Sequence, residues 1–203
     1  MYIEILLSSV IGYLLGSVPF ALVIGKVFFQ KDIRNHGSRN LGGCNSGRVL
    51  GKKAGVAVMT LDLLKATAAM GLASCFENSE VTMIIAGLAT AIGHCYPVFA
   101  GFKGGKAVAA LYGFLFGLAL FTECSLLTFI LPLIVFMLVL YFTKIVSLSS
   151  IVGSISSSIY LIATTDSKLI WVVSLILTAI VIVRHKANIA RMIRKEENKI
   201  SWM

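Results

Sequence analysis

The stretch Asp32–Arg48 is rich in side chains that are suited to binding an anion. Cations, amides and hydroxyls recur along it at Arg34, Arg39, Arg48, Asn35, Asn40, Asn45, Ser38 and Ser46. Four glycines lie among them, and glycine lets backbone N–H groups turn toward a ligand without a Cβ in the way. Inward N–H groups and arginine guanidinium groups together form a cradle for a phosphate. We therefore predict that this stretch is a phosphate-binding loop.

A second glycine-rich stretch, Phe102–Lys106, leads directly into an apolar segment. A glycine turn at the start of a helix binds anions through its N–H groups and through the helix dipole. The stretch is not a Walker loop, because the spacing GxxxxGK[ST] is absent and Ala107 follows Lys106. We predict that Lys106, together with Gly104 and Gly105, forms a second anion-binding segment.

The composition indicates a membrane protein. Hydrophobic residues make up 58% of the 203 residues and charged residues only 13%, which is typical of a polytopic membrane protein rather than of a soluble one. The net charge of +9 is explained by the positive-inside rule and by anionic lipids or substrates, so no nucleic-acid partner is expected. Protein partners are not indicated. The cysteines lack metal-ligand spacing, and no internal repeat or linker is visible, so we expect a single domain over residues 1–203 without a metal or cofactor.

The apolar segments predict the fold. At about 20 residues per membrane span, the chain divides into Ile3–Phe29, Ala54–Phe76, Val81–Phe99, Ala107–Phe121, Ser125–Phe142, Ile151–Ala163 and Leu169–Val183. The fold class is therefore an all-α integral membrane protein, a single bundle of about seven transmembrane helices, with short turns such as Glu77–Glu80 between them. Pro19 should kink the first helix, because proline removes a backbone hydrogen bond.

Two further features concern the helices. Asp62 and Lys65 fall inside the second span at i, i+3, so they can pair on one helix face, and either a structural ion pair or a catalytic role is consistent with their depth. Beyond the last span, Arg184, Asn188, Arg191 and Lys195 have helical spacing. We expect the last helix to continue out of the membrane through these residues.

Charge asymmetry predicts the orientation. With the N-terminus outside, nearly all lysines and arginines fall in the inner segments, and the outer turns hold only Lys168. The positive-inside rule then places the C-terminus in the cytoplasm. Both glycine-rich loops, the serines of Ser147–Ser150 and the polar segment Arg184–Asn188 all fall on the cytoplasmic face. Four distant polar segments on one side of an apolar bundle favour a composite site over a solvated basic rim.

A site with several cations beside a lipid-accessible groove suits one phosphorylated polar substrate and one lipid-like substrate. An acyl donor with a phosphate leaving group would use both loops, because the cations would neutralise the leaving phosphate and stabilise a tetrahedral oxyanion. His185 is a candidate base, since an imidazole titrates near neutral pH. An interfacial hydrogen-bonding role for His185, and a substrate phosphate oxygen as the base, stay open, and His36 and His94 have the same ambiguity.

Six motifs resemble one family in their order and spacing across almost the whole chain. They are Gly16–Pro19, Asp32–Asn40, Asn45–Arg48, Gly93–Lys106, Ser147–Ser150 and Arg184–Asn188. They resemble the bacterial acyl-phosphate-dependent glycerol-3-phosphate acyltransferases (the PlsY family). The resemblance implies transfer of an acyl group from acyl phosphate to the 1-hydroxyl of glycerol 3-phosphate, giving 1-acyl-glycerol 3-phosphate (lysophosphatidate) and phosphate. This is the first step of bacterial phospholipid synthesis, performed in the cell membrane from its cytoplasmic face.

The resemblance also implies the site residues. The catalytic residues would be Ser38, Lys106 and His185, and the substrate-binding residues would be Arg34, Asn40, Asn45, Arg48, Gly104, Gly105, Ser147, Ser149 and Asn188. We assign Arg48, Lys106, His185 and Asn188 to glycerol 3-phosphate. Ser38, Asn45 and the glycine amides are assigned to acyl phosphate. The partners implied are these two substrates and membrane lipid.

Three residues depart from the family pattern, which has glycine at Arg39, threonine at Cys44 and glycine at Ala107. Arg39 would oppose a turn with positive φ, Cys44 lacks a hydroxyl donor, and Ala107 would crowd a phosphate. An alternative to the enzyme is therefore an inactive or specialised paralogue that binds the same ligands. A phosphate-ester transporter is a further alternative, although transporters bind near the bilayer midplane between repeats.

Overall fold

Every apolar segment that predicts a membrane span forms helix in the computed structural model, which describes residues 2–76 and 79–200. Residues 77 and 78 of the predicted turn Glu77–Glu80 lie outside the described residues. The α-helices of the described chain are α1 (Tyr2–Gly16), α2 (Phe20–Phe29), α3 (Gly43–Leu50), α4 (Lys52–Phe76), α5 (Glu80–Cys95), α6 (Val108–Phe121), α7 (Leu127–Thr143), α8 (Val146–Thr164), α9 (Lys168–Arg184) and α10 (Lys186–Ile193). Two short 3₁₀ helices, Ile33–Asn35 and Val98–Ala100, lie in the loops.

Four stretches of the described chain are long and apolar enough to cross a membrane: 2–29, 52–76, 80–100 and 146–164. The bent pair α9 and α10 makes a fifth if it is taken as one span. The helices α6 and α7 are apolar but shorter, with 14 and 17 residues. The chain is therefore an all-helical, multi-pass integral membrane protein with four to five long apolar spans.

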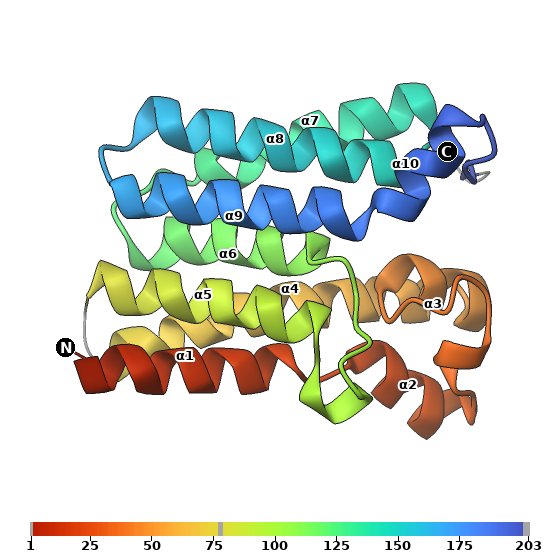
Figure 1. Ribbon diagram of the computed structural model, residues 1–203, viewed down its shortest axis with the longest axis horizontal. Helices are drawn as coiled ribbons and strands as arrows, with labels where there is room; N and C mark the ends of the chain where they lie inside the picture. The colour runs from red at the N-terminus through yellow and green to blue at the C-terminus, as the bar shows by residue number, and fades with distance from the viewer. Residues whose placement is uncertain (1, 77–78, 201–203) are drawn as a thin grey trace.

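The long helices run side by side along the longest axis of the molecule (Figure 1). Helix α6 forms the centre, because Leu111, Phe114, Leu115 and Leu118 are fully buried against its neighbours. Helices α1 and α5 approach closely at glycines: a Cβ at Gly12 or Gly16 would overlap the α5 backbone. Small residues at such contacts are what allow helices to pack tightly in lipid.

The predicted kink at Pro19 is confirmed as a full break between α1 and α2. Proline has no N–H, so the helical ladder stops there. The carbonyl of Val18 accepts a hydrogen bond from the Lys65 ammonium of α4 at 3.1 Å. The break turns α2 away from α1 and brings the loop after α2 to the same end of the bundle as α3 and α10 (Figure 1).

The prediction of a continuous last helix is wrong. The helix breaks at His185, and α10 is bent by 57° from α9. At the break, His185 Nδ1 hydrogen-bonds the Val181 carbonyl at 2.8 Å, and the His185 backbone N–H is shared between the carbonyls of Val181 and Ile182. The bend carries Asn188 and Arg191 over the end of the bundle.

Candidate active site

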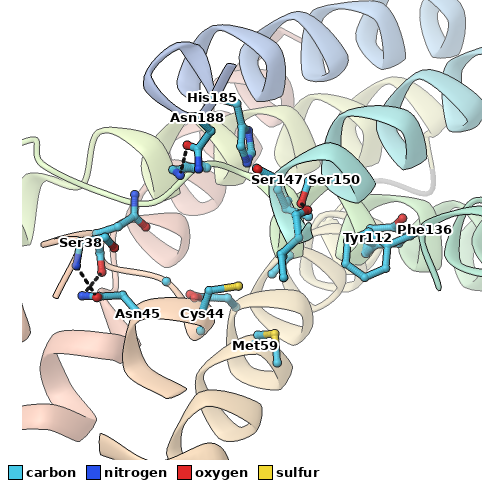
Figure 2. Close-up of a pocket in the computed structure, with 18 of the residues that line it drawn as sticks. Ser38, Cys44, Asn45, Met59, Tyr112, Phe136, Ser147, Ser150, His185 and Asn188 are labelled. Atoms are coloured by element: carbon cyan, nitrogen blue, oxygen red, sulfur yellow. Dashed lines mark hydrogen bonds between the residues drawn. The ribbon is translucent and has the colours of Figure 1, made fainter. Parts of the chain in front are cut away.

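A cavity of about 750 Å³ lies among the loops at this end of the bundle. Figure 2 shows Ser38 and Asn45 on one side of it, Tyr112 and Phe136 on the opposite side, and His185 and Asn188 above. The predicted site residues that line it are Ser38, Asn40, Asn45, Arg48, Lys106, Ser147, His185 and Asn188. Its far end is lined by Leu63, Val108, Tyr112, Phe129, Leu133 and Phe136. The volume and the mixture of an apolar wall with few polar groups are typical of a small-ligand site.

Asn45 organises the first loop from within. Its Oδ1 accepts the Ser38 N–H at 2.8 Å, and its Nδ2 donates to the carbonyls of His36 and Asn40, each at 3.1 Å. Gly37 has φ +59°, and a Cβ there would overlap the Asn45 amide. Asn45 is 2% exposed, so its amide shapes the loop and presents Ser38 to the cavity.

Arg34 is predicted to bind substrate, but it lies outside the set of described residues that line the cavity. Its guanidinium pairs with Asp32, with Nη2 2.6 Å from Oδ2 and Nε donating to Oδ1 at 3.0 Å. The hydrogen bond from Arg34 holds the pKa of the Asp32 carboxyl well below its ordinary value. Both charges are therefore used in closing the turn that begins the loop.

Helix α3 aims Cys44 and Arg48 into the cavity. Helix α3 can lie close to α4 because Gly55 of α4 packs against Gly47 of α3. A Cβ added to Gly55 would lie 2.6 Å from the Gly47 Cα. The Cys44 side chain is exposed to the cavity space, but protein surrounds that space. Desolvation raises the pKa of the Cys44 thiol, although the Arg48 and Lys106 charges oppose this shift.

The second loop uses its glycines differently from the prediction. The N–H groups of Gly104 and Gly105 donate to the carbonyls of Cys95 and His94 at 3.1 and 2.9 Å. Their own carbonyls accept from Arg184, each at 3.0 Å. The amides predicted to bind phosphate are therefore committed within the protein, and both glycines lie outside the described cavity lining.

Lys106 is the residue of the second loop that reaches the cavity. Its Nζ donates to Asn188 Oδ1 at 2.6 Å, which joins the second loop to α10. Burial lowers the pKa of the Lys106 ammonium from its ordinary value, and the nearby arginines of α9 and α10 act in the same direction. A cation in partial burial interacts strongly with an arriving anion.

Helix α8 presents Ser147 and Ser150 to the cavity, whereas Ser149 is fully buried and donates to the Ile145 carbonyl at 2.9 Å. The helical period explains this correction. Residues three apart share a helix face, whereas residues two apart do not. The sequence pattern contained this signal once the serines were assigned to a helix.

His185 lines the cavity at the bend between α9 and α10 and is 3% exposed. Its Nδ1 is bonded to a carbonyl, which only accepts, so Nδ1 carries the hydrogen. In the neutral ring Nε2 then has the lone pair that a base requires.

Glu197 belongs to the site although the sequence analysis did not single it out. Its carboxylate accepts hydrogen bonds from Ser147 Oγ at 2.9 Å, Asn188 Nδ2 at 2.6 Å and Arg191 Nε at 2.7 Å. Burial raises the pKa of Glu197, but these three bonds outweigh it and hold the pKa below its ordinary value. A glutamate in a charged tail ordinarily indicates a solvated residue, so the sequence held no signal for this contact.

Two of the departures from the family pattern occupy the left-handed backbone region. Arg39 has φ +60° and Ala107 has φ +61°. A residue other than glycine in this region costs about 1–2 kcal/mol.

The exposed residue of this pair gives a clean stability test. We expect Arg39→Gly to raise the free energy of unfolding by about 1 kcal/mol, because glycine adopts φ near +60° without steric cost. The measurement is thermal unfolding of purified protein in detergent. Asn35→Gly, which lies in the 3₁₀ helix of the same loop, is the matched control and should be destabilising. Equal effects of the two substitutions would contradict the role assigned to the backbone at Arg39.

Comparisons with known proteins agree with one family. The family model described as glycerol-3-phosphate acyltransferase matches residues 6–195. A glycerol-3-phosphate acyltransferase of Bacillus cytotoxicus is 46% identical over 202 residues, covering 100% of this chain and 98% of the relative. One from Streptococcus pneumoniae is 43% identical over 202 residues, covering 95% of this chain and 92% of the relative.

Two similar crystal structures are of PlsY, an integral membrane glycerol 3-phosphate acyltransferase. The glycerol 3-phosphate form has a TM-score of 0.89 and 35% identity, covering 97% of this chain and 96% of that one. The lysophosphatidic acid form has a TM-score of 0.86 and 33% identity, covering 97% and 95%. The chain therefore belongs to the glycerol-3-phosphate acyltransferase family and is an enzyme of the PlsY type.

Proposed function

We propose that the chain transfers an acyl group from acyl phosphate to the 1-hydroxyl of glycerol 3-phosphate and releases phosphate. The product is 1-acyl-glycerol 3-phosphate, formed in the first step of bacterial phospholipid synthesis. The observation that carries the proposal is a single cavity with a cationic end and an aromatic and aliphatic end. A ligand with a phosphate and an acyl chain matches both ends, and one solved relative was crystallised in a lysophosphatidic acid form.

The cations of the cavity divide the work of binding. Arg48 and Lys106 enter from the two loops, and Asn188 bridges toward α10 through its 2.6 Å bond from Lys106. This polar group would hold the phosphate of glycerol 3-phosphate, with His185 beside its glycerol hydroxyls. Ser38 would contact the phosphate of the acyl donor. The amides of Asn45, Gly104 and Gly105 are engaged in protein hydrogen bonds, so they would shape the site rather than bind the donor.

The aromatic end is a firm wall for the acyl chain. Tyr112 contacts Phe129 and Phe136 edge-on, with ring centroids 6.3 and 6.0 Å apart. Its hydroxyl donates to the Pro132 carbonyl at 3.0 Å, which ties α6 to α7. A buried tyrosine satisfied in this way presents only apolar surface to the cavity.

The reaction follows from this arrangement. The 1-hydroxyl oxygen attacks the acyl carbonyl carbon, a C–O bond forms, and the carbonyl oxygen becomes an oxyanion that neighbouring cations stabilise. The C–O bond to phosphate then breaks and phosphate leaves. The hydroxyl proton passes either to His185 Nε2 or to an oxygen of a substrate phosphate. Holding both substrates in one cavity supplies much of the remaining rate.

In this proposal the bundle crosses the membrane about seven times, with the N-terminus outside and the site on the cytoplasmic face of the bacterial membrane. Although short, α6 and α7 run alongside the longer helices (Figure 1). The basic loops, α3 and α10 gather at the cavity end, whereas Lys168 begins α9 at the other end. This distribution supports the orientation through the positive-inside rule.

A donor assay tests the proposal. Purified protein should form lysophosphatidate from glycerol 3-phosphate and acyl phosphate but not from acyl-CoA, because the leaving group must occupy a phosphate site. Product from acyl-CoA alone would contradict the donor assignment. Binding of glycerol 3-phosphate without any product would favour the specialised-paralogue alternative.

Cys44 offers a test of where glycerol 3-phosphate binds. Because the thiol is exposed to the cavity, a maleimide should modify it, slowly at neutral pH since its pKa is raised. We expect saturating glycerol 3-phosphate to slow this modification about tenfold or more, as a ligand that occupies its site 90% of the time would. The measurement is mass spectrometry in a Cys75→Ser background, because Cys75 is also exposed. Unchanged labelling would contradict this location.

A further inference from the structure

A buried ionic cluster lies beneath the second loop. Asp62 and Lys65 of α4 and His94 of α5 are 2%, 6% and 6% exposed. Ionisable side chains inside an apolar bundle are costly unless they are paired and hydrogen-bonded. Asp62 and His94 also line the cavity, but the reaction outlined for the substrates uses none of the three residues.

The cluster joins α4 to the break between α1 and α2 and to α5. Lys65 Nζ lies 2.7 Å from Asp62 Oδ1 and also donates to the Val18 carbonyl at the break between α1 and α2. The same Asp62 Oδ1 also lies 3.4 Å from His94 Nδ1, so the carboxylate contacts both the Lys65 ammonium and the His94 ring.

The opposite edge of the His94 ring packs on the second loop. A Cβ at Gly105 would overlap His94 Nε2, so the ring lies directly against the Gly105 backbone. The Gly105 N–H donates to the His94 carbonyl at 2.9 Å. From the far side, the Gly105 carbonyl accepts from Arg184 Nε at 3.0 Å. Gly105 is thus held between His94 and Arg184, one residue before the Lys106 ammonium that faces the cavity.

We propose that Asp62 and His94 are positioning residues, which hold Gly104–Gly105 in place so that Lys106 is aimed at the substrate phosphate. The inference rests on the proposed function, because it assigns Lys106 to that phosphate. In this arrangement Gly104 and Gly105 have a steric role. They allow the imidazole and the loop to approach closely, and their N–H groups serve the loop rather than the ligand.

One rival explanation is that the cluster only holds α4 against α5, and another is that His94, which lines the cavity, contacts the substrate directly. The explanations differ in whether the effect of a His94 substitution depends on the presence of Lys106. If it acts through Lys106, His94→Gln should lower kcat/KM for glycerol 3-phosphate by up to about 100-fold, because misplacing a catalytic group by about 1 Å can cost that much. In a Lys106→Ala background the same substitution should change the residual kcat/KM by less than about twofold, because there is no ammonium left to aim. If the loss of kcat/KM in the double variant equalled the product of the losses in the two single variants, the proposal would be overturned.

A second double-mutant cycle measures the binding of glycerol 3-phosphate, so it does not depend on the residual activity of a Lys106 variant. Gly105→Ala places a methyl group against the His94 ring, so we expect it to weaken glycerol 3-phosphate binding strongly in the native background. In a His94→Ala background the methyl group has space, and the additional loss on Gly105→Ala should shrink to less than about threefold. Equal losses in both backgrounds would mean that Gly105 serves the ligand directly, which would overturn the steric role.

Thr67→Val is the matched control for both cycles. Thr67 lies on α4 like Asp62, is buried, and donates to the Gly113 carbonyl of α6 at 2.9 Å, away from the loop. It should lower the unfolding temperature without changing the apparent affinity for glycerol 3-phosphate.

Equilibrium binding of radiolabelled glycerol 3-phosphate is measured beside turnover. Normal binding without turnover in the unmodified protein would count against the proposed function alone, whereas additive cycles in an active protein would count against this inference alone.

Discussion

Replacing Lys106 with alanine lowers kcat/KM by about 10²- to 10³-fold, the loss typical of removing one group that stabilises developing charge in a dry site. Lys106 Nζ lies at the cationic end of the cavity and donates to Asn188 Oδ1 at 2.6 Å. Its removal takes a charge from the phosphate and frees Asn188 from the loop. The measurement is the initial rate of lysophosphatidate formation over a range of glycerol 3-phosphate concentrations.

Lys103→Ala is the control for this experiment. Lys103 lies in the same loop with the same charge, but it is exposed and lies outside the described cavity lining. It should keep nearly full turnover. Full turnover by Lys106→Ala would show that the second loop does not contribute a cation to the reaction.

Replacing Glu197 with glutamine lowers the unfolding free energy by about 2 kcal/mol at neutral pH, because three hydrogen bonds lose a charged acceptor. The folded-state pKa of Glu197 lies below its ordinary value of 4.5. Its contribution is therefore fully present above pH 4.5 and is lost as the pH falls through the lowered pKa. The unfolding temperature of the native protein should exceed that of the variant at neutral pH and converge with it in acid.

Glu196→Gln provides the comparison one residue away. Glu196 pairs with Arg194 on the surface, with side chains 59% and 62% exposed, so its loss should be small. Glu197→Gln should also weaken glycerol 3-phosphate binding, since Asn188 and Arg191 are both held by this carboxylate. A constant difference in unfolding temperature from neutral to acid pH would contradict the assigned titration.

The helices were predictable because the apolar segments and their breaks are local properties of the sequence. Pro19 interrupts the first span, since proline lacks an N–H, although α7 continues through Pro132. The break at His185 was not predictable in the same way, because helical spacing continues across it and no proline or glycine marks it.

The first loop and the cavity cations were predicted as a group, but the division of labour inside the group was not. Asn45 and Arg34 have the same chemistry as ligand-binding residues, yet the fold uses them to shape the loop. The glycines of the second loop indicated an anion site, whereas their N–H groups fold the loop onto α5. Side-chain type limits which bonds form, and only tertiary structure decides whether the partner is protein or ligand.

Contacts distant in sequence were the least predictable. Glu197 reaches Ser147 of α8 because the tail turns back after α10, and the Ile200 N–H donates to the Lys144 carbonyl at 2.9 Å. The contact between Asp62 and His94 joins α4 and α5 in the same way. No short-range pattern specifies such a contact.

In the proposed reaction, separate loops build one cavity in which both anionic substrates react together. This reaction is tested most directly by following phosphate release from acyl phosphate by purified protein, with and without glycerol 3-phosphate. One phosphate should appear for each lysophosphatidate formed, with essentially none before glycerol 3-phosphate is added. Rapid phosphate release without glycerol 3-phosphate, or product without equivalent phosphate, would contradict the shared cavity as the site of a direct transfer.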